Sequence, residues 1–229
     1  MAPITGRFIS IVGLTISMHA QPKKRKKGNR IVSRTLWVLL ACAVLLCSCG
    51  GNTVFLSQVA PNIGEEQLLL LVDGTEYVHY QEIAATPENF IVTASVLHGA
   101  CEEDDRLRIF ATTYAAYYRD DGDTVVQQGA SIVPVALTFV RNTQGAYALV
   151  DYTSASDGAE FTPSVINFCK TPVTGRTIMA LADQIMNAYG DNETLNALHM
   201  QKLADYLAAD GRTGVYYKAY DDAQPVLMD

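Results

Sequence analysis

Residues 131–152, SIVPVALTFVRNTQGAYALVDY, decide the fold class. The first half alternates in hydrophobicity, which places every second side chain on one face of a strand: Val133, Val135, Leu137 and Phe139. Residues 142–145 are typical turn formers, and a second β-rich run follows them from residue 146 to 152. Because a short polar turn joins the two runs, this stretch predicts two neighbouring antiparallel strands.

Two further runs before this stretch have the composition of strands. Residues 90–97 and 107–118 are rich in Ile, Val, Phe, Thr and Tyr, which fit a pleated and half-buried surface. The first run ends at Gly99. The second ends at the sequence DDGD, residues 120–123, which has turn chemistry. Both runs are therefore predicted to be strands of the same sheet.

A hairpin is also predicted near the start of the folded part. Residues 68–72 and 76–80 flank Asp73-Gly74, a dipeptide that favours the positive φ angles of a two-residue hairpin turn. With this hairpin, the chain is expected to form an antiparallel β meander of about five or six strands.

The period of the hydrophobic pattern changes after residue 177. Apolar residues recur at intervals of three and four over residues 178–189 and again over residues 195–206, which predicts two amphipathic helices. Gly190 and Gly211 follow them as helix-ending residues. We expect a C-terminal αα-hairpin packed on one sheet face, and therefore an α+β fold with strands first and helices last.

The charge of the chain is divided at Cys49. Eight of the 17 Lys and Arg residues precede it, whereas all 24 Asp and Glu residues follow it. The part from Cys49 onwards therefore carries a net charge of −15. Such a strongly acidic domain should repel nucleic acid and anionic lipid headgroups, so neither is expected as a partner.

The first 48 residues are predicted to be a signal peptide. A basic block is followed by the apolar run 35–46 and then by small residues, which is the order that export requires. The run has 12 residues, and about 20 are needed to cross a bilayer as a helix. A shorter leader that starts at Met18 is the alternative.

The end of the leader contains the sequence LCSCGG, residues 46–51, which resembles the lipobox of bacterial lipoproteins. The resemblance implies cleavage before Cys49 and acylation of that cysteine; Cys47 is the alternative acceptor. It predicts a protein anchored by lipid at the outer face of the cell membrane. Residues 49–64 would form the lipidated cysteine and linker, and residues 65–229 a single extracytoplasmic α+β domain.

A second resemblance covers roughly residues 88–190. The segments GASIVPVALTF (129–139), GAYALVDY (145–152), DG (157–158) and SVINF (164–168) look like a domain of uncharacterised Firmicutes lipoproteins. A similar domain is appended to membrane zinc peptidases of the beta-lactam-sensor type. The resemblance implies a fold and no known activity. Unlike those peptidases, this chain has no HExxH motif and no set of membrane spans.

Candidate site residues are few. Cys101 and Cys169 are either a disulfide pair or two buried thiols, and the sequence leaves both open. A ligand-binding groove lined by aromatic rings is a further prediction, built from tyrosines on neighbouring strands: Tyr114, Tyr117, Tyr118, Tyr147 and Tyr152. Core packing of these rings is the alternative.

Two classes of function follow. The sequence from Cys49 onwards contains no GxSxG, SxxK or HExxH motif and no cysteine–histidine cluster, so no catalytic residue, metal or cofactor is predicted. The first hypothesis is a non-catalytic binding, sensing or accessory module for a peptide, glycan or envelope protein. The alternative is a cell-envelope hydrolase with a site assembled from distant residues. A cleft joining a histidine to a carboxylate and a hydroxyl would favour the hydrolase.

Overall fold

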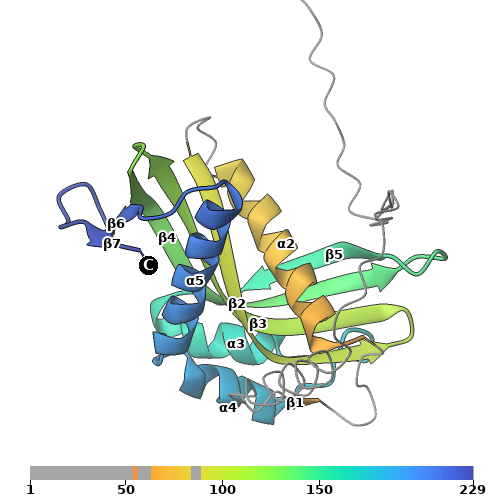
Figure 1. The fold of residues 1–229 in the computed structure, drawn as a ribbon. Helices are drawn as coiled ribbons and strands as arrows, with labels where there is room; N and C mark the ends of the chain where they lie inside the picture. The colour runs from red at the N-terminus through yellow and green to blue at the C-terminus, as the bar shows by residue number, and fades with distance from the viewer. Residues whose placement is uncertain (1–53, 56–62, 84–88, 229) are drawn as a thin grey trace, which may run out of the picture. The chain divides into compact units, whose positions relative to one another are not determined.

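The computed structural model describes residues 54–55, 63–83 and 89–228 (Figure 1). The predicted signal peptide, the lipidation site Cys49 and most of the predicted linker lie outside these residues. The elements, in chain order, are β1 (Val54–Phe55), α2 (Glu65–Ile83), β2 (Asn89–Glu103), β3 (Arg106–Asp120), β4 (Thr124–Arg141), β5 (Tyr147–Ser154), a 3-10 turn (Gly158–Glu160), α3 (Phe161–Phe168), α4 (Met179–Ala188), α5 (Glu193–Ala209), β6 (Tyr216–Lys218) and β7 (Val226–Leu227).

The mixed α and β class is confirmed, and the sheet is built on three long strands. β2, β3 and β4 pair antiparallel in that order. β4 has 18 residues and pairs with two further strands: its end pairs antiparallel with β5, and its beginning pairs parallel with β6. β7 closes one side by pairing with β6, and β1 makes a short parallel pair with β2.

Each of the long pairings is interrupted by one extra residue. The register shifts between Leu97 and Gly99, which leaves His98 unpaired in β2. In β4 and β5 the corresponding unpaired residues are Gln128 and Val150. Such bulges bend a strand and increase its twist, and here they accompany the curl of the sheet in Figure 1.

The hairpin predicted around Asp73-Gly74 is wrong, because residues 65–83 form the helix α2. Glycine in a helix interior costs about 1 kcal/mol relative to alanine, and here Gly74 does not take a positive φ. Burial outweighs that cost. Leu68 and Val72, four residues apart, are fully buried against the sheet. A strand pattern would have placed these two residues on one face as well, so the dipeptide misled the interpretation.

The other predicted elements exist, with longer strands than expected. β2 continues past Gly99 to Glu103, into the acidic residues 102–105. The DDGD sequence forms the β3–β4 turn, with Gly122 at a φ of 86°. The two predicted helices correspond to α4 and α5. α4 contacts α3 and β2, whereas α5 contacts β2 and β3. No helix among the residues that the structure describes is both long and apolar enough to cross a membrane.

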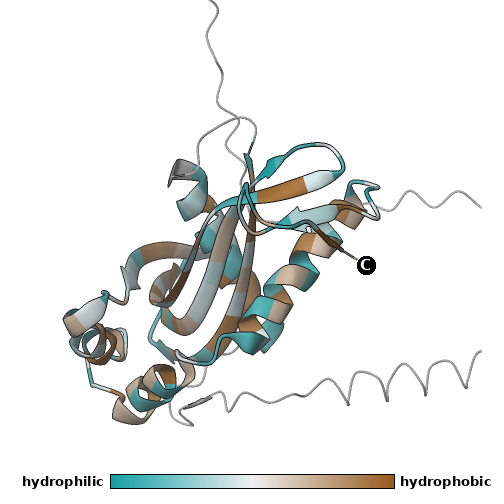
Figure 2. Ribbon diagram, turned by 90° about the vertical axis from the view of Figure 1, so that its left-hand side faces the viewer, coloured by the Kyte–Doolittle hydropathy of each residue, from teal (hydrophilic) through white to brown (hydrophobic). Residues whose placement is uncertain are grey.

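Three hydrophobic clusters hold the helices on the sheet. Leu68 and Val72 of α2 belong to the first. The second surrounds Phe110 of β3 and the residues of α3 and α4, and the third contains Leu203 and Leu207 of α5. The long strands in Figure 2 carry many hydrophobic residues, in agreement with their burial between helices. Figure 1 shows α2 and α5 on either side of β2.

Candidate functional site

The five predicted tyrosines do not line one surface. Tyr114 and Tyr118 point from β3 towards α5, and Tyr118 is fully buried. Tyr117 points to the opposite face, where its ring covers Gly129 so closely that a Cβ there would overlap it. Tyr147 donates a hydrogen bond to Glu102 at the far end of the sheet, and Tyr152 stacks on His79 of α2. The structure therefore brings only Tyr114 and Tyr118 together, and they pack in or beside the core.

Two of the described histidines are interior residues. His199 is fully buried, with Nε2 2.6 Å from the Tyr118 hydroxyl and its ring stacked on Tyr114. His98 is 4% exposed and forms a 2.7 Å hydrogen bond with Thr112. Burial lowers the pKa of each imidazole to about 4. Neither histidine has a carboxylate partner in these bonds, so neither forms the cleft that would favour a hydrolase.

Cys101 and Cys169 are free and buried in the same hydrophobic cluster. Burial raises the pKa of both thiols to about 12, which keeps them protonated at neutral pH. The structure therefore has two unpaired thiols. A disulfide between Cys101 and Cys169 stays a prediction.

Two of the acidic residues 102–105, Glu102 and Glu103, contact other parts of the protein. Glu102 forms an ion pair with Arg141, with 3.4 Å between Oε1 and Nη2. Glu103 accepts hydrogen bonds from the backbone N–H groups of Val173 and Thr174 and so holds the loop before α4. In the part of the chain that the structure describes, no group of three or more metal-ligating side chains comes together.

The most unusual buried group is Glu76 of α2, which sequence reasoning missed. Its side chain is fully buried, and neither carboxylate oxygen has a hydrogen-bond partner among the described residues. Burial raises its pKa from 4.5 to about 7, an effect that the nearby hydroxyls of Tyr152 and Thr113 only partly offset. The sequence signal was its spacing, because Glu76 follows Leu68 and Val72 at intervals of four.

The buried side chains of Glu76, His98 and His199 predict that stability is greatest near pH 7 and falls on acidification. Near pH 5 the unfolded chain carries a proton on each of the two histidines that the folded chain does not bind, whereas folded Glu76 keeps a proton that the unfolded chain loses above pH 4.5. The net difference of one proton there lowers the free energy of unfolding by about 1.4 kcal/mol per pH unit on acidification.

Urea unfolding at pH 4.5, 5.5 and 6.5 measures this slope. The variant Glu76→Gln lacks the opposing proton, so its slope should steepen to about 2.7 kcal/mol per pH unit. Equal slopes for the variant and the unchanged protein would contradict the assignment of Glu76.

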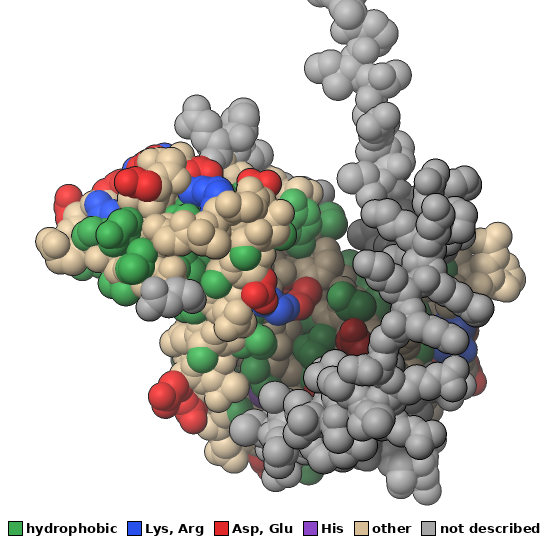
Figure 3. Space-filling view, viewed as in Figure 1, with side chains coloured by type: hydrophobic (Ala, Val, Ile, Leu, Met, Phe, Trp, Pro, Cys, Tyr) green, Lys and Arg blue, Asp and Glu red, His purple; other side chains and the backbone are tan. Residues whose placement is uncertain are grey.

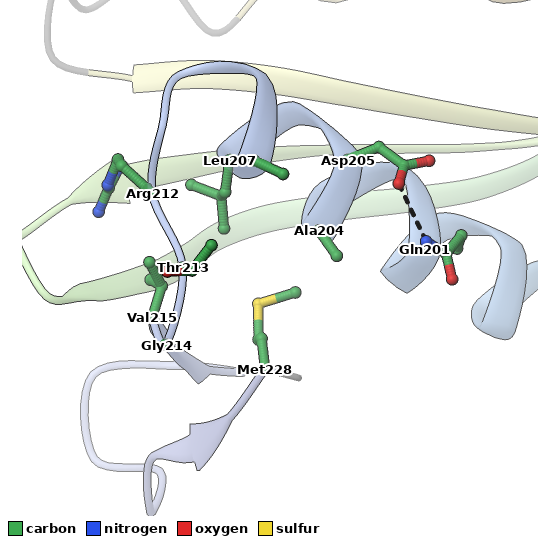
Figure 4. A pocket seen from close by; sticks show the side chains of 10 residues that line it. Gln201, Ala204, Asp205, Leu207, Arg212, Thr213, Gly214, Val215 and Met228 are labelled. Atoms are coloured by element: carbon green, nitrogen blue, oxygen red, sulfur yellow. Dashed lines mark hydrogen bonds between the residues drawn. The ribbon is translucent and has the colours of Figure 1, made fainter. Parts of the chain in front are cut away.

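The surface feature best suited to bind a partner is a groove at the C-terminal end of α5 (Figure 4). It has a volume of about 340 Å³ and lies between α5 and the chain that leads into and out of the β6–β7 pair. Met228 reaches towards Ala204 across the groove, and Arg212 points away from it. The lining residues are Gln201, Ala204, Asp205, Leu207, Ala208, Arg212, Thr213, Gly214, Val215 and Met228.

Exposed hydrophobic side chains gather beside this groove. Figure 3 shows hydrophobic surface at the corner formed by β6 and β7. Four of the large hydrophobic residues that are at least 40% exposed belong to this corner: Tyr216, Tyr220, Val226 and Leu227. We call the groove and these four residues the C-terminal surface. Exposed aromatic and aliphatic side chains around a concavity are typical of protein interaction sites.

The cations near the C-terminal surface are already bound to acidic side chains or carbonyls. Arg212 pairs with Asp120, at 2.6 Å, and Arg119 pairs with Asp121 and Asp221. Asp205, in contrast, has only the Gln201 amide as a hydrogen-bond partner, and it is exposed at the rim of the groove. The free charge of the groove is therefore negative.

Sequence reasoning missed this groove because its second wall has almost no local signal. The apolar run from Val215 to Tyr217 is too short to predict a strand. Tyr216 and Tyr217 of this run belong to the strand β6 because they pair with β4 and β7. Met228 reaches the groove through a backbone hydrogen bond to Val215, a contact between residues that sequence spacing does not predict.

Comparison with models of protein families, with curated proteins and with solved structures finds no match for this chain. The resemblance to Firmicutes lipoproteins stays a prediction.

Proposed function

We propose that this protein is a lipid-anchored extracytoplasmic binding module that holds a polypeptide segment at its C-terminal surface. The observation that carries the proposal is the groove between α5 and the β6–β7 corner, with its border of exposed hydrophobic side chains. The predicted anchor on Cys49 supplies the location, at the outer face of the cell membrane, where an envelope protein would provide the segment.

The shape and lining of the groove support a short apolar segment as its occupant. Six of its ten lining residues are small or apolar, Ala204, Leu207, Val215 and Met228 among them. β7 is the last strand of its side of the sheet, so its outer backbone groups remain available to an extended chain. An apolar side chain in the groove and backbone pairing at β7 would together bind an extended peptide.

The charge of the rim supports a basic residue beside the apolar one. Asp205 has no cationic partner among the described residues, and the sequence from Cys49 onwards carries a net charge of −15. Like charges across an interface oppose binding, so an acidic segment is disfavoured and a lysine or arginine next to the apolar residue is favoured. The proposed partner is therefore a segment of an envelope protein that combines leucine-like and basic residues.

The proposal predicts saturable binding of a fluorescein-labelled peptide with Leu flanked by Lys, and at least tenfold weaker binding of the same peptide with Glu in place of Lys. Fluorescence anisotropy with the full chain in detergent measures both affinities. In Ala208→Trp the new ring fills the groove, so the affinity for the Lys peptide should fall at least tenfold.

Ala209→Trp is the matched control. Ala209 is the next residue of α5 and is also exposed, but it does not line the groove. Its variant should bind the Lys peptide within twofold of the unchanged protein. An equal loss in both variants, or no saturable binding of either peptide, would contradict the proposal.

A further inference from the structure

The packing of α2 places an acidic group where hydrophobic contact holds the helix to the sheet. Glu76 lies one turn after Val72 and two turns after Leu68, and all three side chains are fully buried. The two apolar residues contact Leu97, Leu107 and other members of the first hydrophobic cluster. A carboxylate buried at the third position, with only the hydroxyls of Tyr152 and Thr113 near it, is costly in its charged form.

Among the described residues, no ion pair joins a cation to Glu76 to offset that cost. The ionisable groups that face it are Asp73 and Tyr80 of α2 and Tyr152 of β5, and each of these is neutral or negative. Lys202 of α5 is bound to Asp73 instead. From β3 the group that faces Glu76 is Thr113, a hydroxyl without charge.

The remaining polar contacts of α2 are made one turn away, at Asp73. Its carboxylate accepts a 2.6 Å hydrogen bond from Ser95 and binds Lys202, and its backbone carbonyl accepts one from Thr93. These contacts join α2 to β2 and α5. Asp73 is thus bound by a cation and by hydroxyl groups, whereas the buried carboxyl of Glu76 is the group whose charge opposes docking.

We propose that α2 is a pH-controlled latch: a proton on Glu76 keeps the helix docked on the sheet, and loss of that proton promotes its release. In the docked state the carboxyl group is buried and keeps its proton to higher pH than in the released state, where water solvates the carboxylate. Docking therefore weakens as the pH rises. Release would uncover the first hydrophobic cluster.

The size of the effect follows from linkage. Burial shifts the pKa of Glu76 from 4.5 to about 7, so the opening equilibrium of α2 should rise up to tenfold per pH unit between these two values and level off above them. His98 and His199 lie on β2 and α5, outside α2, so their titration acts on global unfolding and not on local release of this helix.

Hydrogen exchange of the α2 amides in the full chain, followed by mass spectrometry from pH 5 to 8, tests the latch. The variant Glu76→Gln keeps the shape of the side chain without an ionisable group and corrects for the intrinsic pH dependence of exchange. Relative to this variant, the exchange rate of α2 should rise up to tenfold per pH unit to about pH 7, and the α2 amides should exchange faster than the β3 amides, which open only by global unfolding.

His79→Gln is the control for the histidine of α2, which stacks on Tyr152 at the sheet surface. This variant should keep the full pH dependence of α2 exchange. Glu76→Leu should abolish it, as Glu76→Gln does, and so provides a second variant if glutamine perturbs folding. The latch is overturned if α2 exchange in the unchanged protein parallels that in Glu76→Gln, or if His79→Gln is the variant that removes the pH dependence.

Discussion

Replacing Phe110 by alanine is expected to lower the free energy of unfolding by about 3–5 kcal/mol, which is the range for truncating a buried phenylalanine. Phe110 is fully buried in the middle of β3 and belongs to the cluster that holds α3 and α4 on the sheet. The other members of this cluster come from two helices, α3 and α4, from the strands β2 and β4, and from the residues beside them. Because separate helices and strands surround this site, they cannot move together to fill the cavity that the smaller side chain leaves. We therefore expect the full loss of stability.

Urea unfolding at pH 6.5 measures this loss, with Leu149→Ala as control. Leu149 lies on the outer strand β5 and is 43% exposed, so its truncation should change the free energy of unfolding by no more than about 0.5 kcal/mol. If the two variants unfold at the same urea concentration, Phe110 is not in the core and the arrangement of α3 and α4 on the sheet is wrong.

The strands could be predicted because their signal is local. In β4, alternate residues such as Val135 and Leu137 belong to the cluster beneath α2, while Ala136 between them belongs to the cluster beneath α3 and α4. Alternation of this kind is a property of each strand itself. The lengths were underestimated because His98 and Gly99 looked like a strand end, whereas they form a bulge within β2.

α2 and the groove could not be predicted because tertiary contacts decide both. The dipeptide Asp73-Gly74 favours a turn locally, but the face of the sheet opposite α3 and α4 needs cover, and Leu68 and Val72 supply it only as a helix. The groove joins α5 to Met228, near the end of the chain. The spacing of Glu76 after Leu68 and Val72 predicts its burial only if the segment is a helix, so the hairpin interpretation concealed it.

Alanine at Cys49 is expected to abolish lipid attachment completely. The thiol is the proposed acceptor of the lipid, and no other side chain can replace its nucleophilic sulfur. The apolar run before it has 12 residues, too few to hold the chain in a bilayer as a helix. The protein should therefore leave the membrane fraction when the lipid is lost, and the net charge of −15 from residue 49 onwards gives it no electrostatic attraction to an anionic membrane surface.

Cys47→Ala is the matched control, since Cys47 is also a cysteine of the lipobox-like sequence and lies two residues before Cys49. It should leave both lipid attachment and membrane association unchanged. A loss of label in Cys47→Ala alone would move the anchor to that residue and leave the location at the membrane intact.

The most direct test of the lipid anchor is metabolic labelling of cells with a fatty acid that can be detected on the purified protein. The unchanged chain and Cys47→Ala should carry the label and sediment with membranes, and Cys49→Ala should carry none and appear in the soluble fraction. An unlabelled chain, or a label that persists in Cys49→Ala, would contradict a lipid-anchored module.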